Sequence, residues 1–110
     1  MYAVVPLEWC PHLTQVTDVP VSGLKTSQPC EECQDHSENW VCLTCYKVLC
    51  GRFVNEHMLM HGITNEHYMV LSLSDLSVWC YSCDAYIHHS ILHEVKRAAH
   101  LDKFGMDIPS

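Results

Sequence analysis

The chain is short and acidic, with 110 residues, a formal net charge of −7, eight cysteines and nine histidines. Its six lysines and arginines are scattered among thirteen acidic residues. This balance excludes the basic patch typical of nucleic-acid binding and favours a basic peptide as partner. The sequence has no run of about 18 apolar residues, so we expect no membrane-spanning helix and no membrane partner.

A chain of this length predicts one small domain, which buries a modest core and needs additional stabilisation. The opening MYAVVPLEWC has neither a basic stretch nor a long apolar stretch, so no signal peptide is expected. We therefore predict a cytoplasmic protein, with the nucleus as the alternative, in which cysteines stay reduced.

The predicted strands are short and follow a long loop. Residues 13–28 contain Pro20, Gly23 and several serines and threonines, which predicts a loop with short extended pieces. After this loop, β-prone segments are expected at 39–44, 48–51, 68–73, 78–81 and 85–89. No internal repeat is apparent in the sequence.

Two helices complete the predicted fold. The first is expected over 55–61, where His57 and His61 lie four residues apart and share one helix face. The second is expected over 91–103 with Ser90 as its N-cap. Its apolar face would consist of Ile91, Leu92, Val95 and Ala99. The predicted class is α+β, with a small, twisted antiparallel sheet and two helices.

Cysteines and histidines fall at spacings typical of metal sites. Three Cys-x-x-Cys pairs are the strongest signal, because two intervening residues let both sulfurs reach one ion from a tight turn. A Cys-x-His pair, a further cysteine and three histidines bring the set to twelve, which divides into three tetrahedral zinc sites. The twelve are Cys10, His12, Cys30, Cys33, Cys42, Cys45, Cys50, His57, His61, His67, Cys80 and Cys83.

Other chemistries for the cysteines are disfavoured. Disulfides need an oxidising compartment, and a thioredoxin-like Cys-x-x-Cys motif normally occurs once. A catalytic zinc needs an open coordination position and a general base. Twelve ligands for three ions leave no position open, and the string between His57 and His61 contains no acid. We predict three structural zinc ions as cofactors, no catalytic residues, and a domain that is not itself an enzyme.

The order of these residues resembles that of the UBP-type ubiquitin-binding zinc finger, a domain found in ubiquitin-specific proteases. The resemblance includes the Cys-Gly-Arg step at 50–52 and the strings ENWVCLTCYKVLCGRF, WCYSCDAYIHH and KFGMD. It covers residues 7–109 as a single domain, with 1–6 and 110 as flanking residues. It also implies a larger parent protein, a zinc-dependent lysine deacetylase acting on tubulin, that links ubiquitin to aggresome and autophagy handling.

The resemblance implies a grouping of the ligands, which spacing alone leaves open. The first zinc ion would tie the two ends of the domain together, and the other two would be bound in an interleaved cross-brace. The implied sets are Cys10, His12, Cys80 and Cys83; Cys30, Cys33, Cys50 and His57; and Cys42, Cys45, His61 and His67.

The implied partner is the free C-terminal tail of ubiquitin, Arg-Leu-Arg-Gly-Gly, and other peptides ending in Gly-Gly remain open as competitors. Arg52 would supply a fork of donors to the terminal carboxylate. Trp40 and Trp79 carry over as flat walls around the glycines, and Tyr86 as a hydroxyl donor. Tyr81 would line the tail.

Two neighbours of Arg52 belong to the same predicted site. Gly51 would permit close backbone approach. Phe53 stands where close relatives carry Tyr, and loss of a hydroxyl bond there would weaken binding by about 0.5–1.5 kcal/mol.

Alternative roles remain for the same residues. Without the resemblance, Trp40 and Trp79 fit a core role and Arg52 an ordinary surface role, while Trp9 is expected to pack against the first zinc site. The alternative functions are a UBP-type scaffold without ubiquitin binding and a RING-like ubiquitin ligase module. Ligands beyond eight disfavour the RING-like module, and the retained aromatic and arginine residues disfavour the scaffold. A monomer is expected.

Overall fold

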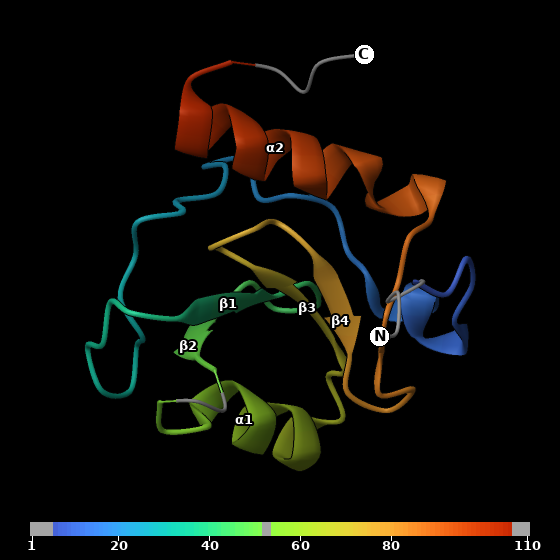
Figure 1. Ribbon diagram of the computed structural model, residues 1–110, viewed down its shortest axis with the longest axis horizontal. Coiled ribbons are helices and arrows are strands. Elements are labelled where there is room, and N and C mark those ends of the chain that lie inside the picture. The colour runs from blue at the N-terminus through green and yellow to red at the C-terminus, as the bar shows by residue number, and fades with distance from the viewer. Residues whose placement is uncertain (1–5, 52–53, 107–110) are drawn as a thin grey trace, which may run out of the picture.

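The computed structural model describes residues 6–51 and 54–106. One five-stranded sheet forms its centre, with strands in the order β2-β1-β3-β4-β5 and every neighbouring pair antiparallel. Figure 1 labels β1 to β4 of this sheet. The elements along the chain are the 3-10 helix η1 (Pro11–Gln15), β1 (Asn39–Cys42), β2 (Val48–Cys50), α1 (His57–Asn65), β3 (Met69–Ser72), β4 (Val78–Cys80), β5 (Ala85–Tyr86), the 3-10 helix η2 (Ser90–Leu92) and α2 (His93–Phe104). The α+β class and the antiparallel sheet with two α-helices are confirmed.

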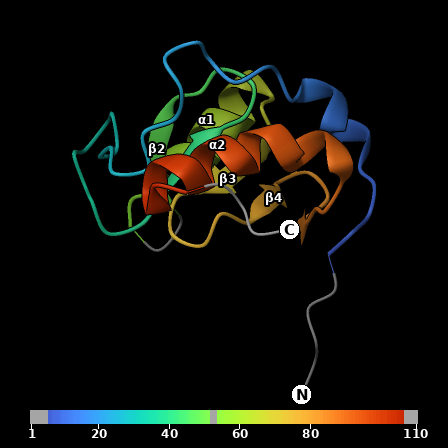
Figure 2. The ribbon, with the colours of Figure 1, turned by 90° about the horizontal axis from the view of Figure 1, so that it is seen from above.

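The two α-helices cover opposite faces of the sheet (Figure 1). Because side chains alternate along a strand, each strand contributes to both faces. Val41 and Leu71 belong to the apolar cluster that contains Val95 and Ala99 of α2. Cysteine and valine side chains of the same strands belong to a second cluster with Met58 of α1. Figure 2 shows α2 lying across the sheet.

The helix boundaries differ from those predicted. The first α-helix spans His57–Asn65 rather than 55–61, because Glu56 adopts a left-handed conformation (φ 59°) that cannot continue a helix. The chain remains helical until Glu66, also left-handed, whose N–H donates to the Gly62 carbonyl. Within the described residues, no helix is both long enough and apolar enough to cross a membrane.

The start of the second helix was also predicted wrongly. Ser90 is not the N-cap: the ring of His89 accepts a hydrogen bond from the Ile91 N–H at 3.1 Å, and a 3-10 turn precedes α2. Leu92, Val95 and Ala99 are buried as predicted, whereas Ile91 is 51% exposed and does not belong to the buried face.

The structure contains an internal repeat that sequence inspection did not find. β1 and β2 form one hairpin, and β3 and β4 form another. Each strand of the second hairpin lies thirty residues after its counterpart in the first: β3 (Met69–Ser72) corresponds to β1 (Asn39–Cys42), and β4 (Val78–Cys80) corresponds to β2 (Val48–Cys50). The two turns match as well. Tyr46 (φ 62°) donates its N–H to the Cys42 carbonyl at 2.8 Å, and Leu76 (φ 63°) donates to Ser72 at 2.9 Å. The repeat is visible in the backbone geometry but not in the sequence, where only Leu43, Val48 and Cys50 recur thirty residues later.

The N-terminal segment is attached to the far edge of the sheet. Leu7 bridges Ile87 in parallel, with the Leu7 N–H donating to the Tyr86 carbonyl and the His88 N–H donating to the Leu7 carbonyl, both at 2.8 Å. This attachment places Cys10 beside the turn that follows β4.

Candidate metal centres and peptide-binding face

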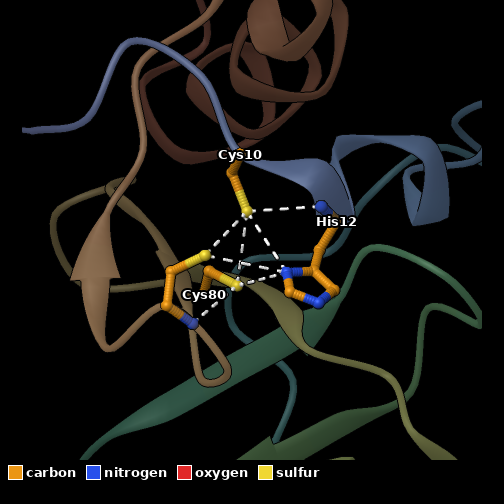
Figure 3. A group of neighbouring side chains, drawn as sticks. Cys10, His12 and Cys80 are labelled. Carbon is orange, nitrogen blue, oxygen red and sulfur yellow. Dashed lines mark hydrogen bonds between the residues drawn. The ribbon is translucent and has the colours of Figure 1, made fainter.

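The first cysteine and histidine group joins the two ends of the domain. Cys10 precedes η1, His12 lies on it, and Cys80 ends β4; all three side chains point toward one another (Figure 3). The Cys10 Sγ lies 3.5 Å from the Cys80 Sγ and 3.3 Å from the Cys83 Sγ. The His12 Nδ1 lies 3.4 Å from the sulfurs of both Cys10 and Cys80.

The second group lies between the loop before β1, the end of β2 and α1. The His57 Nδ1 is 3.4 Å from both the Cys30 Sγ and the Cys50 Sγ. The Cys33 Sγ lies 3.9 Å from the Cys50 Sγ. Because His57 is the first residue of α1, this group fixes the start of that helix.

The third group uses the turn after β1, the middle of α1 and the segment that follows α1. The His61 Nε2 lies 3.3 Å from the Cys45 Sγ and 3.3 Å from the His67 Nδ1, which is 3.6 Å from the Cys42 Sγ. The second and third groups therefore interleave in sequence and both attach α1 to the sheet. In each group the four ligand atoms lie within 4.8 Å of one another, and the membership of the three groups is the same as that implied by the resemblance.

The geometry and chemistry of the three groups suit zinc. Zinc–sulfur bonds of about 2.3 Å and zinc–nitrogen bonds of about 2.0–2.1 Å give tetrahedral edges of roughly 3.3–3.8 Å. The distances above are close to those edges. Four sulfur and nitrogen donors per group leave no open position, so the three clusters form structural zinc sites.

The same turn presents the paired sulfurs in all three groups. The residue after each Cys-x-x-Cys pair has a left-handed backbone: Gln34 (φ 63°), Tyr46 (φ 62°) and Asp84 (φ 53°). Backbone N–H groups point at the first sulfur of a pair, as where Glu32 N–H donates to the Cys30 Sγ and Cys83 N–H to the Cys80 Sγ, each at 3.4 Å. None of the three left-handed residues is a glycine, so the residue types at these positions do not predict a left-handed backbone.

Without a metal, four of these thiols resist ionisation, because burial raises the pKa of Cys42, Cys50, Cys80 and Cys83. Burial and hydrogen bonds to the neighbouring thiols raise the pKa of Cys83 to about 12, and burial also raises the pKa of Cys50. Cys30 differs: burial opposes its ionisation, but the Cys33 N–H and the His57 side chain lower its pKa to about 6. A divalent cation is therefore required to hold four donors together as thiolates and neutral imidazoles.

The glycine within α1 allows the third group to close. A Cβ built on Gly62 would lie 2.9 Å from the backbone carbonyl oxygen of His67 and 3.5 Å from Cδ2 of Tyr81. The His67 N–H donates to the Gly62 carbonyl at 3.2 Å. A larger residue at 62 would therefore push a zinc ligand out of position.

We expect Gly62→Ala to destabilise the domain by about 1–3 kcal/mol through this overpacking, although alanine normally stabilises a helix interior relative to glycine. Chemical denaturation with zinc stoichiometry by native mass spectrometry measures both effects. Ile63→Ala is the matched control, since Ile63 is 63% exposed on the same helix. Equal stability of the Gly62→Ala variant and the parent chain would contradict the expectation.

The predicted aromatic walls share the sheet face that carries α1. Trp40 on β1 and Trp79 on β4 both pack against the cluster that contains Met58 and Val70. β3 lies between them in the sheet, and Val70 is directly opposite Trp79. Two strand spacings, about 9.6 Å, therefore separate the strands that carry the two indoles.

The remaining described members of the predicted site lie around these two indoles. The Tyr86 ring meets Trp79 edge to face, with centroids 4.8 Å apart. Tyr81 packs against the same cluster as the tryptophans. A Cβ built on Gly51 would lie 2.8 Å from the Trp40 Nε1, so the glycine is required by this close approach rather than by its backbone conformation.

Arg52, Phe53 and Trp9 remain from the sequence predictions. Arg52 and Phe53 lie outside the described residues, between Gly51 and Val54, whose N–H donates to the Gly51 carbonyl at 3.1 Å. Trp9 is 66% exposed, so its predicted packing against the first zinc site is wrong.

Known proteins similar to this chain include deacetylases and ubiquitin hydrolases. The chain is 53% identical over 109 residues to histone deacetylase 6 of Caenorhabditis elegans, covering 99% of the chain and 11% of that protein. It is 42% identical over 101 residues to the NAD-dependent deacetylase sir2A of Dictyostelium discoideum, covering 86% of the chain and 19% of the relative. Ubiquitin carboxyl-terminal hydrolase 44 of Xenopus tropicalis is 40% identical over 58 residues, 53% of this chain and 9% of the hydrolase. The chain thus spans less than a fifth of the length of these relatives.

Solved structures share the fold at low sequence identity. An essential yeast splicing factor aligns with a TM-score of 0.66 and 22% identity, over 80% of this chain and 23% of that one. A SAGA deubiquitinating module containing Ubp8, Sgf11, Sus1 and Sgf73, bound to ubiquitin aldehyde, aligns with a TM-score of 0.54 and 20% identity, over 98% of this chain and 29% of that one.

A family model supports the same assignment. The model described as "Zn-finger in ubiquitin-hydrolases and other protein" matches residues 30–92, which include two of the three zinc groups and both tryptophans of the sheet face. Each zinc group has four protein ligands, so the zinc ions of this finger are structural rather than catalytic. The chain therefore belongs to the UBP-type family of zinc fingers found in ubiquitin hydrolases and other proteins.

Proposed function

We propose that this domain captures the free C-terminal Gly-Gly carboxylate of unanchored ubiquitin. The observation that supports this most is the arrangement of Trp40 and Trp79 on one sheet face, with Gly51 against the first indole. Two glycines present no side chains, so aromatic surfaces can lie directly against their backbone. Because zinc groups fix the strands that carry these residues, the face is rigid before the peptide binds, which lowers the entropy lost on binding.

Charge supports the same partner. A terminal carboxylate taken out of water needs charge-assisted donors, and Arg52 supplies them in a fork, with the Tyr86 hydroxyl as a further donor. Tyr81 and Phe53 complete the proposed lining. The net charge of −7 suits a tail that carries two arginines.

Calorimetric titration with two peptides tests the proposal. Both have the sequence Arg-Leu-Arg-Gly-Gly, one with a free C-terminus and one amidated. Carboxylate capture predicts that only the free acid binds measurably. Equal binding of both peptides, or binding of neither, would leave a zinc-stabilised scaffold as the better description.

The parent protein is part of the same proposal. Similarity to histone deacetylase 6 over 99% of the chain favours a cytoplasmic lysine deacetylase, acting on tubulin, in which this monomeric finger links ubiquitin to aggresome and autophagy handling. Similarity to an NAD-dependent deacetylase indicates that the finger accompanies more than one deacetylase chemistry. The RING-like alternative is weaker, because the third zinc group exceeds the eight ligands of a two-zinc cross-brace.

A further inference from the structure

A carboxylate of the chain itself lies inside the proposed peptide site. The Glu38 Oε1 is 3.4 Å from the Trp40 Nε1, which donates to it. A Cβ built on Gly51 would lie only 1.8 Å from the same oxygen and 2.8 Å from the Glu38 Cδ. The Glu38 side chain therefore lies directly on the α-carbon of Gly51 and beside the edge of the Trp40 indole.

The backbone of Glu38 is fixed, whereas its side chain is not. Its carbonyl accepts from the Gly51 N–H at 3.0 Å, and in the turn just before it the Asp35 carboxylate accepts from the Ser37 N–H at 2.8 Å. The side chain is half-buried, and its hydrogen bond from the Trp40 indole is a long one, at 3.4 Å. The carboxylate can therefore turn about its own side-chain bonds without disturbing β1.

A second carboxylate entering this face would meet the first. Two unit charges of the same sign about 4 Å apart repel, and the repulsion is stronger near a protein surface than in water. A cationic residue in the ligand, immediately before the terminal Gly-Gly, converts this repulsion into attraction. Each extended residue spans about 3.3–3.6 Å, so such a residue begins roughly 7 Å from the terminal glycine and its long side chain can return toward Glu38.

We propose that Glu38 is a specificity-determining residue, which selects tails with a basic residue directly before Gly-Gly and rejects tails with a neutral or acidic one. This inference rests on the proposed capture of a free Gly-Gly carboxylate. Glu38 covers Gly51 and Trp40 in the free domain, and it turns outward to pair with the incoming guanidinium. Specificity then comes from both an attraction to the correct tail and a repulsion of the wrong one.

The test measures a preference rather than a single affinity. The intact domain and Glu38→Gln are each titrated with the free acids Arg-Leu-Arg-Gly-Gly and Arg-Leu-Ala-Gly-Gly. We expect the intact domain to prefer the first peptide by about five- to tenfold and Glu38→Gln by about twofold or less. Glu94→Gln is the matched control: it removes the same charge from α2, which packs on the opposite face of the sheet.

Two further measurements keep the test decisive. In the intact domain the preference for arginine should shrink severalfold between low and high salt, because the pair is partly exposed. Glu38→Lys should reverse the selection toward Arg-Leu-Glu-Gly-Gly. If the intact domain binds the first peptide and either the salt series or Glu38→Gln leaves the preference unchanged, the inference is overturned while carboxylate capture stands. If the intact domain binds neither peptide, both proposals are overturned.

Discussion

Removal of zinc is expected to unfold the domain completely. The apolar core is divided into two clusters, one on each face of a five-stranded sheet, and a domain of this size is marginally stable without help. Structural zinc binding supplies about 10–16 kcal/mol per site at neutral pH, comparable to or larger than the total stability of a typical domain, about 5–15 kcal/mol. Far-UV circular dichroism and amide proton dispersion during chelator titration measure the loss, and added zinc should restore both.

Acidification should produce the same unfolding. In the metal-bound state each thiol ionises far below its metal-free pKa, such as the value of about 12 for Cys83. Groups whose pKa is lowered in the folded state stabilise it at higher pH, and that stabilisation is lost as pH falls. Retained amide dispersion at full zinc release would show that the core alone holds the fold.

Arg52→Ala is expected to weaken binding of the free ubiquitin tail by about 2–5 kcal/mol, because the terminal carboxylate would be left without its charged partner. The fold should survive, since none of the twelve zinc-group residues changes. Calorimetry gives the affinity, and native mass spectrometry confirms three zinc ions per chain.

Arg97→Ala is the matched control for this substitution. It also removes one arginine, but from α2, which packs on the opposite sheet face from Trp40. Similar losses of affinity in the two variants would indicate a diffuse charge effect and remove Arg52 from its proposed role.

Sequence reasoning reached the class, the five strands and the metal chemistry for clear physical reasons. A tight turn that presents two sulfurs to one ion requires Cys-x-x-Cys spacing, and a half-buried strand requires alternating apolar residues. Both features therefore produce a local pattern in the sequence. The resemblance supplied the pairing of distant ligands such as Cys10 with Cys80, which local spacing does not encode. Helix ends were less predictable, because Glu56 is left-handed although glutamate is not a residue type that signals this conformation.

The candidate site was likewise only partly predictable from the sequence. Trp40 and Trp79 were placed together by family resemblance, and their common sheet face follows from strand register, which pairs β1 and β4 with β3. Glu38 had no sequence signal at all. Its position over Gly51 depends on the loop before β1, where Asp35 and Ser37 form a local turn.

The repeated hairpin turn bears on the order of events during folding. At the turn after β3, Ser72 and Asp75 occupy the positions that Cys42 and Cys45 hold at the turn after β1. The Ser72 Oγ accepts from the Ser74 N–H at 3.2 Å, much as a first cysteine sulfur accepts from its own turn. One copy of this loop thus takes its shape with oxygen in place of sulfur and with no metal. The nascent chain can form such turns before it binds an ion. Zinc then binds pairs of sulfurs that are already adjacent, and it joins distant segments of the chain rather than shaping each turn.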